Sequence, residues 1–534
     1  MDLHTTDDHD DTDSTAQGAA TALADAIRTT LGPNGMDKMV VGENGTVVVT
    51  NDGSKIVEWM DITHPVGRLV ARVASAQDDA VGDGTTTTVV LAGALIGEAA
   101  TLRAAGLHPT TIADGYVRAA EVATERLGQY GLTLRDRDDE RLTHVARTAV
   151  TGRWDDASTD RFADLTLDAL RRVAFDTSKL TLTAYPGGEL RESACIDGIV
   201  VDLDASSTSL DARPQAIDDP TIAMVDGELG IAEPDRVHSV RFEDATQREA
   251  FHDRERAIRD DIVSQVTQSG ATVLCCQKSV DDAVRTALVQ RGVFPVERTR
   301  RDEFDVIARA TGSTPVTSVD ELTASDTGTA DSVDHRTVGT TETLVLRGCP
   351  CEQRVSLLLR GGTPHVAAEV RRIVADCIDV TRLVLGDGTL VPGGGAVPTA
   401  LAMDIAAASP GITDRTQRVF DGFAAALEAI PRTLATNAGT DPLDTLTTLR
   451  QRHHAGSKTA GVGPDGRPCD MPDAGVYEPS AVFESALRRA VAVAVMVLRV
   501  DEVVHTGGDD HAADAAHHDH GHAATSGYPW AVGH

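Results

Sequence analysis

The first 140 residues alternate between helix-type and strand-type patterns of apolar positions. Residues 19–30 are rich in alanine with helical spacing, and this helix is predicted to end at the Gly/Pro loop 31–35. Residues 39–41 and 46–50 are β-type runs on either side of an Asn-Gly turn signal, which predicts a hairpin. A long helix of small residues is predicted over 85–105. The N-terminal part is therefore expected to be mainly helical.

The middle of the chain has a different pattern. Short Val/Ile runs alternate there with helical stretches, which is typical of an α/β domain. The runs lie at 199–202, 221–225 and 272–275, and the helical stretches at 250–269 and 280–290. Helical patterns return at 365–385, 396–450 and 480–500. Because the two ends resemble each other, we expect an α/β domain inserted into a helical domain that is built from both chain ends.

Composition narrows the class of protein. With 534 residues, of which 41% are hydrophobic and 25% charged, the chain is long enough for two to four globular domains. The apolar runs stay short of the roughly 20 residues of a membrane-spanning helix, and the acidic N-terminus is not a signal peptide. We therefore expect a cytoplasmic protein without a membrane partner.

The charge is strongly acidic, with a net value of −33. A nucleic-acid partner is not expected, because such a partner requires a basic face. Only five lysines occur, and aromatic residues make up 3% of the chain. These features favour a surface adapted to high salt, where screening weakens self-repulsion. An ordinary acidic cytosolic protein is the alternative.

The cysteines and the chain ends suggest little chemistry. Seven scattered cysteines do not indicate a secreted disulfide framework, and Cys349-Pro350-Cys351 lacks enough nearby ligands for zinc, so buried thiols are expected. Residues 1–16 and 506–534 are of low complexity and are predicted to be disordered tails. The cluster His517, His518, Asp519, His520 and His522 could hold a metal ion, although a solvated tail is favoured.

The segment Gly82-Asp83-Gly84, followed by threonines 85–88, is the first candidate for chemistry. Glycines allow a ligand to approach the backbone, and a helix N-terminus favours a phosphate. Asp83 can then hold Mg²⁺ through hard oxygen ligands. A capped helix start explains the same residues, and spacing alone leaves both interpretations open.

Four further segments are individually weak. Loop 31–35 and the Asp52-Gly53 turn have ordinary conformational explanations. Three consecutive glycines at 393–395 indicate direct packing on the backbone, either by a ligand or by another helix. Asp376 flanks the apolar stripe of the helix predicted over 365–385, and periodicity favours a solvated edge over a cleft for it. That stripe consists of Val366, Val370, Ile373, Val374, Cys377 and Val384.

Taken together in chain order, these segments resemble the group II chaperonin family, of the thermosome type, with the composition of a halophilic archaeal member. The resemblance extends from residue 17 to residue 505. It rests on the motifs DAIRTTLGPNGMDKM at 25–39, TNDG at 50–53, HP at 64–65, QDDAVGDGTTT at 77–87, CQK at 276–278, LRGGT at 359–363, VPGGG at 391–395, NAG at 437–439, DP at 441–442 and EP at 478–479.

The resemblance implies a multidomain chaperonin fold with three domains. An α-helical equatorial domain would comprise 17–142 and 391–505, an α+β intermediate hinge domain 143–199 and 353–390, and an inserted α/β apical domain 200–352. The apical domain would carry a protrusion near 229–256. Identical or paralogous subunits would form two stacked rings of eight or nine, which enclose non-native polypeptides.

The resemblance also implies an ATPase that uses ATP and Mg²⁺, with K⁺ as a further candidate. Asp52 and Asp376 would be catalytic and Asp83 would bind the metal. The cofactor-binding residues would be Leu31, Gly32, Pro33, Gly53, Gly84, Thr85, Thr86, Thr87, Gly152, Arg153, Gly394, Gly395 and Glu478.

Four departures from the family pattern concern the expected rate and allosteric response. Asn34 and Arg153 stand where lysines are usual, and Gly461-Val462-Gly463 lacks the usual side chain beside the base. Residues 204–215 have lost the usual apical pattern. No catalytic aspartate is missing, so we expect an active, ATP-driven folding machine. The alternatives are a divergent regulatory or specialised subunit with weak folding activity, or a small-molecule enzyme. The last is disfavoured, since no nucleophile–base pair is evident.

Overall fold

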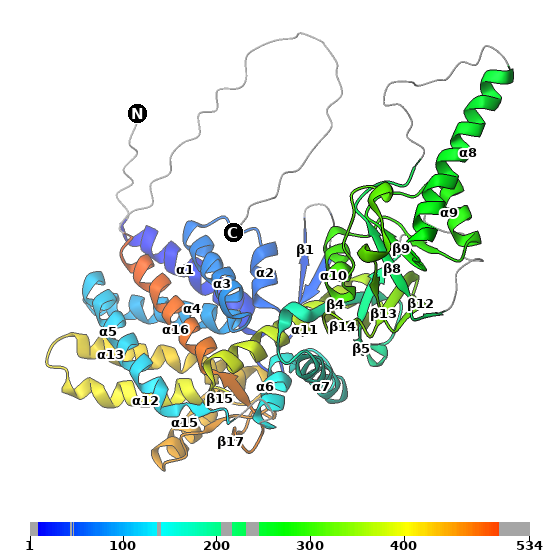
Figure 1. The fold of residues 1–534 in the computed structure, drawn as a ribbon. Coiled ribbons are helices and arrows are strands. Elements are labelled where there is room, and N and C mark those ends of the chain that lie inside the picture. Colours follow the sequence, from blue (N-terminus) through cyan, green and yellow to red (C-terminus); the bar gives the residue numbers. More distant parts are fainter. Residues whose placement is uncertain are drawn as a thin grey trace, which may run out of the picture.

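The computed structural model describes residues 9–42, 45, 47–135, 140–203, 216–230 and 245–500. These residues form three bodies in a row, which we call the helical, central and distal bodies (Figure 1). Separate clusters of buried apolar side chains form their cores.

Segments from both ends of the chain build the helical body. The N-terminal elements are α1 (His9–Arg28), β1 (Lys38–Val41), β2 (Val47–Thr50), α2 (Gly53–Trp59), α3 (Pro65–Val81), α4 (Thr85–Ala104), α5 (Pro109–Leu127) and β3 (Leu132–Thr133). The C-terminal elements are β15 (Thr389–Pro392), α12 (Ala396–Ala408), α13 (Thr416–Leu427), α14 (Ala429–Asn437), α15 (Pro442–His454), β16 (Ala460–Val462), β17 (Pro468–Asp470), β18 (Tyr477–Pro479) and α16 (Ser480–Leu498). One core contains side chains from both sets.

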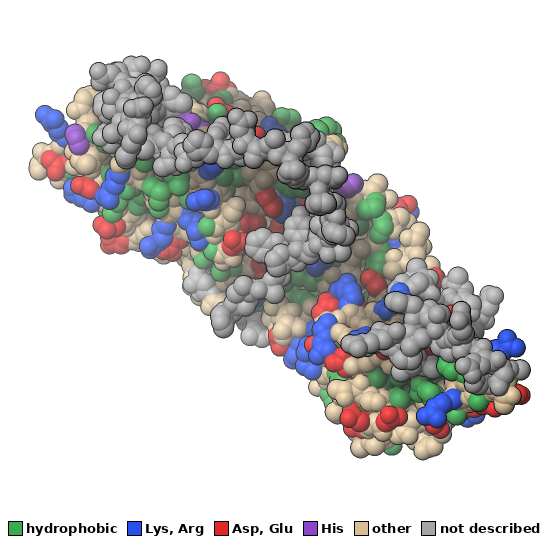
Figure 2. All heavy atoms as spheres, turned by 90° about the horizontal axis from the view of Figure 1, so that it is seen from above, with side chains coloured by type: hydrophobic (Ala, Val, Ile, Leu, Met, Phe, Trp, Pro, Cys, Tyr) green, Lys and Arg blue, Asp and Glu red, His purple; other side chains and the backbone are tan. Residues whose placement is uncertain are grey.

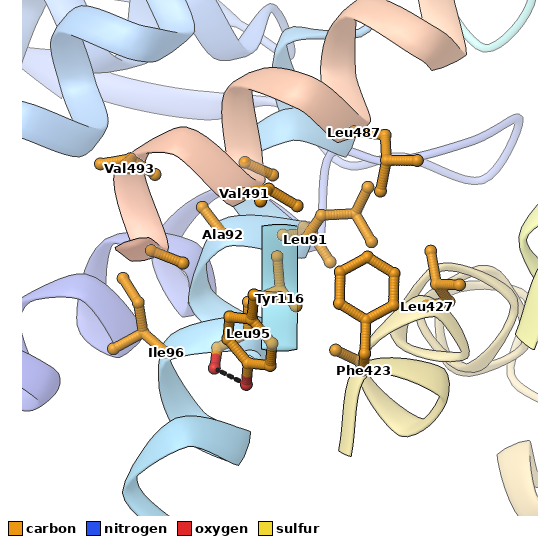
Figure 3. Packing of buried hydrophobic residues seen from close by; sticks show 14 of the residues in the cluster. Leu91, Ala92, Leu95, Ile96, Tyr116, Phe423, Leu427, Leu487, Val491 and Val493 are labelled. Carbon is orange, nitrogen blue, oxygen red and sulfur yellow. Dashed lines mark hydrogen bonds between the residues drawn. The ribbon is translucent and has the colours of Figure 1, made fainter. Parts of the chain in front are cut away.

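Helix α4 lies at the centre of this core and packs against α1, α13 and α16. Its apolar residues surround the helix, as expected for a fully buried element. The Tyr116 hydroxyl donates to the carbonyl oxygen of Leu95 at 2.8 Å, and the Tyr116 ring meets Phe423 edge-on at 5.7 Å (Figure 3). Within the described ranges α4 is the one helix long and apolar enough to cross a membrane, but 61% of its apolar window is buried here.

The central body is a three-stranded sheet with helices packed against it. Its elements are α6 (Glu140–Val150), α7 (Asp156–Arg172), β4 (Leu180–Pro186), β5 (Ala194–Asp197), β14 (Val355–Gly361) and α11 (Pro364–Asp387). Strand β14 is the middle strand, parallel to β4 and antiparallel to β5, and all of its residues are buried.

Two four-stranded sheets form the distal body. Their elements and the associated helices are β6 (Ile199–Asp202), β7 (Ala216–Asp218), β8 (Thr221–Val225), α8 (Ala245–Gln268), β9 (Val273–Cys276), α9 (Asp282–Gln290), β10 (Phe294–Val296), α10 (Arg301–Thr311), β11 (Gly328–Thr329), β12 (Ser332–Val338) and β13 (Thr341–Arg347). The sheet orders are β10-β9-β8-β11, in which β8, β9 and β10 are parallel, and β6-β13-β12-β7, which is antiparallel. Helix α8 projects beyond both sheets (Figure 1).

Besides a cleft between the helical and the central body, which is described below, a second cavity of about 540 Å³ lies between the central and the distal body. Strand β4 and the first turns of α11 line one side, and β6 and the start of α10 line the other. Glu303 of α10 is buried in its wall, with 9% of its surface exposed.

The elements predicted from apolar patterning are confirmed, with small shifts in their bounds. The hairpin is β1–β2, the small-residue helix is α4, and the three Val/Ile runs are β6, β8 and β9. Helix α1 begins at His9, so the prediction of disorder is wrong for residues 9–16.

Two smaller predictions need correction. Val366 is 42% exposed, because it lies in the first turn of α11, whereas the rest of the predicted apolar stripe is buried. Cys351 is exposed in the loop between β13 and β14, although Cys275, Cys276 and Cys377 are buried as expected. Residues 1–8, 204–215, 231–244 and 501–534, which include the predicted C-terminal tail and part of the predicted protrusion, lie outside the described residues.

Candidate functional site

A cleft of about 250 Å³ lies between the helical and the central body. The predicted site residues that line it are Leu31, Gly32, Pro33, Asp52, Gly53, Asp83, Gly84, Thr85, Thr86, Thr87, Arg153, Asp376, Gly394, Gly395 and Glu478. Gly152 lies behind the wall instead. A Cβ on Gly152 would stand 3.0 Å from the carbonyl oxygen of Gly32, so this residue backs the loop 31–33.

Two long helices direct their N-termini into the cleft. Helix α4 begins after Gly84 and α12 begins after Gly395, and both glycines have positive φ values, 77° and 75°. The unpaired N–H groups and the dipole at such an end favour an anion. The hydroxyl groups of Thr30 and Thr86 lie 3.2 Å apart beside the start of α4. The start of α4 is therefore suited to phosphate groups.

The loop 31–33 is held by residues from the other end of the chain. The Asn437 side chain donates to the carbonyl oxygens of Arg28 and Leu31, at 3.0 and 2.9 Å. Gly32 has a φ of +83°, and a Cβ there would lie 2.4 Å from Leu434 Cδ2, so only glycine fits. Asn34, where the family usually has lysine, donates to the carbonyl oxygen of Pro464 at 2.7 Å. Its amide tethers two loops instead of supplying a charge.

The glycines at 393–395 pack directly against strand β16. The backbone N–H of Val462 donates to the carbonyl oxygen of Gly394 at 2.8 Å. A Cβ on Gly461 would lie 2.8 Å from that same oxygen, which explains why a side chain is missing there. Half-buried Glu478 borders this end, and burial together with nearby Asp83 raises its pKa to about 7.

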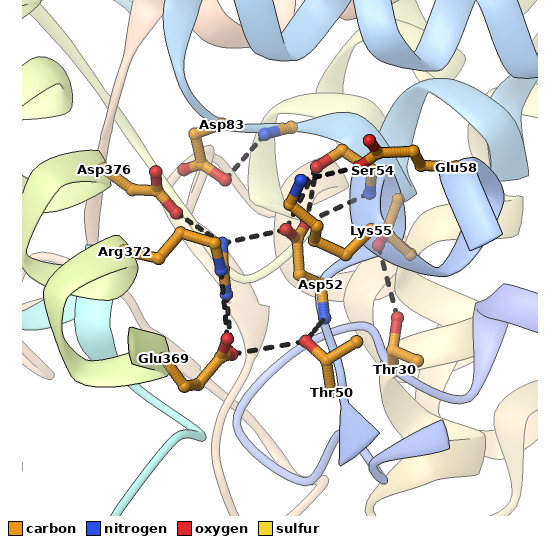
Figure 4. Close-up of polar contacts among 12 residues, drawn as sticks. Thr30, Thr50, Asp52, Ser54, Lys55, Glu58, Asp83, Glu369, Arg372 and Asp376 are labelled. Carbon is orange, nitrogen blue, oxygen red and sulfur yellow. Dashed lines mark hydrogen bonds and ion pairs between the residues drawn. The ribbon is translucent and has the colours of Figure 1, made fainter. Parts of the chain in front are cut away.

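Several carboxylates converge where α11 faces the β2–α2 turn. Asp52 is the N-cap of α2 and accepts the backbone N–H of Ser54 at 3.0 Å, and Asp83 accepts that of Gly84 at 2.6 Å. Asp376 comes from α11 of the central body and faces them (Figure 4). Its side chain is 31% exposed within the cleft wall, so the interpretation of Asp376 as a solvated edge residue is wrong. Periodicity failed because it describes one helix and cannot show the neighbouring body.

Arg372 joins two of these carboxylates. Its Nη1 lies 2.8 Å from Asp52 Oδ2 and 2.7 Å from Asp376 Oδ2, while Nη2 lies 2.7 Å from Oε1 of Glu369 (Figure 4). Burial raises the pKa of Asp376 to about 7, and Arg372 acts in the opposite direction. Burial alone lowers the pKa of Arg372, but its three carboxylate partners raise it overall, so the guanidinium remains charged.

Arg153 lines the cleft wall. Its Nη1 is buried and has no hydrogen-bond partner within the described part of the chain. Burial and the nearby charge of Arg372 lower the pKa of Arg153. A buried donor without a partner is costly, so an anionic ligand oxygen would satisfy it.

Sequence reasoning missed other residues that line or support the cleft. Asn51 and Asp78 line it, and Glu369 and Arg372 organise its carboxylates. Arg372 lies one turn before Asp376, so the i, i+4 spacing on a predicted helix was a usable signal. Its pairing with Asp52, 320 positions away, had no signal in the sequence.

Comparison with known proteins agrees with this arrangement. A model of the TCP-1/cpn60 chaperonin family matches residues 23–507. The chain belongs to this family. It is a group II chaperonin subunit, of the ATP-dependent thermosome type, as the sequence motifs predicted.

Three similar curated proteins are archaeal thermosome subunits. Thermosome subunit alpha of Halobacterium salinarum is 39% identical over 92% of this chain and 87% of its own length. A thermosome subunit of Methanopyrus kandleri is 39% identical over 91% and 90%, and thermosome subunit alpha of Thermoplasma acidophilum is 38% identical over 91% and 90%. The chain is 39% identical to the subunits of both Halobacterium salinarum and Methanopyrus kandleri, so identity alone does not set the Halobacterium protein apart. Adaptation to high salt therefore stays a prediction from composition.

Proposed function

We propose that this group II chaperonin subunit assembles into two stacked rings, of eight or nine identical or paralogous subunits each, in the cytoplasm. The rings bind non-native polypeptides and enclose them as ATP is hydrolysed. In this assignment the helical body is the equatorial domain, 17–142 and 391–505. The central body is the intermediate domain, 143–199 and 353–390, and the distal body is the apical domain, 200–352.

The meeting of carboxylates from two bodies at one cleft carries the proposal. Asp52 belongs to the helical body, whereas Asp376 belongs to α11 of the central body. Arg372 contacts both at ion-pair distance. A movement of the central body therefore changes the geometry of the carboxylates, which couples hydrolysis to domain closure.

The cleft residues fit a magnesium triphosphate. The unsatisfied Nη1 of Arg153 and the glycine-capped start of α4 provide donors for phosphate oxygens. Leu31, Gly32 and Pro33, supported by Gly152, form one side of a phosphate cradle, and Gly53, Gly84, Thr85, Thr86 and Thr87 form the other. Asp83 would hold Mg²⁺, which supplies positive charge to the transferring phosphoryl group. K⁺ is a further candidate ligand.

The remaining cleft residues have separate roles in this proposal. Asp52 and Asp376 would orient and polarise the attacking water as general bases. The backbone at Gly394 and Gly395, which lines the cleft, would accommodate the adenine. Glu478 accepts a hydrogen bond from the ribose.

Hairpin β1–β2 supports the assembly into rings. Its register places Met39 opposite Val49 and Val41 opposite Val47, so these four side chains share one face. They are 69%, 52%, 62% and 42% exposed, respectively. A two-stranded sheet with an exposed apolar face is marginally stable alone, and its edges invite further strands. Contact with another subunit would cover this face.

The distal body is the proposed capture surface for polypeptides. Its helix α8 projects outward and exposes Phe251 and Ile258 among charged side chains (Figure 1). On the face seen in Figure 2, acidic and basic side chains are interspersed over the three bodies. The net charge of −33 suits a surface that stays soluble in molar salt.

The test is refolding of a denatured protein with ATP in molar salt, using wild type, Asp376→Ala and the control Asp379→Ala. Asp379 lies one helical turn further along α11 and is outside the cleft lining, with 52% of its side chain exposed. We expect Asp376→Ala to abolish ATP-dependent refolding and Asp379→Ala to retain it. Equal yields with wild type and Asp376→Ala would refute the proposal. Weak refolding by the wild type alone, restored in mixed rings, would instead identify a regulatory subunit.

A further inference from the structure

The guanidinium of Arg372 sits between the two bodies that form the cleft. One nitrogen, Nη1, contacts Oδ2 of Asp52 and Oδ2 of Asp376, at 2.8 and 2.7 Å. While both contacts hold, the distance between these two carboxylate oxygens cannot exceed the sum of the two contact distances. A single group thus fixes the spacing of carboxylates that lie on different bodies.

The position of Arg372 is itself fixed from both sides. Its Nη2 and Nε contact the two oxygens of Glu369, at 2.7 and 3.1 Å. The Thr50 hydroxyl donates to Glu369 Oε1 at 3.2 Å and accepts the backbone N–H of Asp52 at 3.1 Å. The chain of contacts therefore closes on itself, from α11 to the β2–α2 turn and back (Figure 4). Such a forked arrangement specifies geometry as well as charge.

The local charge requires a cation at this point. Asp52, Asp78, Asp83 and Asp376 all line the cleft, and like charges at short range repel. Without Arg372, α11 and the β2–α2 turn would present carboxylates to each other across the cleft. The ion pair is also only partly exposed, with 19% of the Arg372 side chain and 9% of the Asp52 side chain accessible, so salt screens it weakly.

We propose that Arg372 is a positioning residue that docks α11 onto the β2–α2 turn and sets the spacing of Asp52 and Asp376. The inference rests on the proposed function for the role of the two carboxylates in hydrolysis. The docking itself concerns this chain alone. Arg372 acts through the two aspartates and needs no contact with the nucleotide.

Three variants of the full-length chain test the role of Arg372. Arg372→Met removes the charge and keeps the aliphatic stem. Arg372→Lys keeps the charge but loses the fork on Glu369. Arg371→Met is the matched control, since Arg371 is the adjacent residue on α11 and its Nε donates to Leu182 within the central body, at 3.2 Å.

The first readout is hydrogen exchange of α2 and of the first half of α11, measured without nucleotide. We expect Arg372→Met to speed exchange in both segments by roughly tenfold, Arg372→Lys to give an intermediate value, and Arg371→Met to match wild type. The second readout is ATPase kinetics, in which Arg372→Met should lower kcat by at least about tenfold with KM little changed. The third is calorimetric affinity for Mg-ADP, which should stay within about threefold of wild type.

Each outcome decides the role of Arg372. Wild-type exchange and wild-type kcat in Arg372→Met would overturn it, and so would equal effects of Arg371→Met. If Arg372→Met does not assemble, the hydrogen exchange of Arg372→Lys is used as the test instead. An exchange rate of Arg372→Lys equal to that of wild type would then refute the docking role. If the wild type neither binds nor hydrolyses nucleotide, the proposed function fails, while the exchange experiment still measures the docking.

Discussion

Neutralising Glu303 should stabilise the junction between the central and distal bodies at high pH and leave it unchanged at low pH. Glu303 is 9% exposed in the wall of the second cavity, and its Oε2 has no hydrogen-bond partner among the described residues. Burial raises the pKa of Glu303 from 4.5 to about 7, with Arg300, 3.6 Å away, acting in the opposite direction. Asp202 and Asp302 add to the effect of burial.

The magnitude follows from the two pKa values. Between them the folded state holds a proton that the unfolded state has lost, so stability falls as the pH rises from 4.5 to about 7. Each pH unit in this window is worth about 1.4 kcal/mol, so the full displacement corresponds to about 3 kcal/mol. Glu303→Gln has the same shape without the charge. It should therefore be up to about 3 kcal/mol more stable than wild type at pH 8, and equal to it near pH 4.5.

The assay is hydrogen exchange of the α10 amides in the assembled protein, corrected for the intrinsic exchange rate at each pH. The opening free energies of wild type and Glu303→Gln should diverge as the pH rises from 4.5 to about 7, and their difference should stay constant above that pH. Asp302→Asn is the control. Its carboxylate hydrogen-bonds Arg300, which lowers the pKa of Asp302, so neutralising it should give no gain at pH 8. A difference between wild type and Glu303→Gln that is constant with pH would refute the reasoning.

Three other predictions concern the cleft and the assembly. Gly394→Ala should weaken nucleotide binding measured by calorimetry, because a Cβ on Gly394 would lie 2.4 Å from Met471 Sδ, at a φ of +59°. In the control, Gly97→Ala on helix α4, the added Cβ meets nothing within 4 Å, so binding should be unchanged and the free energy of unfolding should rise by about 0.5–1 kcal/mol. ATP hydrolysis at saturating ATP should slow as the pH falls through about 7, because burial raises the pKa of Asp376 and its carboxylate becomes protonated. A hydrolysis rate that does not change within about one pH unit on either side of that pKa would contradict a role of Asp376 as general base. The double variant Met39→Asp, Val49→Asp should shift the rings toward single subunits in native mass spectrometry, whereas aspartates introduced at Thr447 and Thr448 of α15 should leave the rings intact. Intact rings in the hairpin double variant would exclude the hairpin as a subunit contact.

Much of the fold was predictable because local patterns carried it. Helix α4 was evident from its run of small apolar residues, and hairpin β1–β2 from its turn signal. Helix α1 was predicted to start later than His9, since its acidic N-terminal stretch has the composition of a tail. The family motifs named the loops that meet at the cleft, and the structure brings them together.

The remaining site features depend on contacts between distant segments. Asp376 was placed at a solvated edge because the periodicity of α11 contains no information about the helical body. The pairing of Arg372 with Asp52 is invisible for the same reason. The missing side chain at Gly461 was noticed as a departure, but its cause, the nearby carbonyl oxygen of Gly394, is a tertiary contact.

Helix α11 contributes to the walls of both cavities. Ala367, Ala368 and Arg371 border the cavity beside the distal body, and Asp376 borders the cleft beside the helical body. These positions lie about 8 to 14 Å from Asp376 along one unbroken helix, at 1.5 Å per residue. Because one helix borders both cavities, a rotation of α11 as one body that narrows one cavity reshapes the other, which would couple the proposed ATP site to the base of the proposed capture surface.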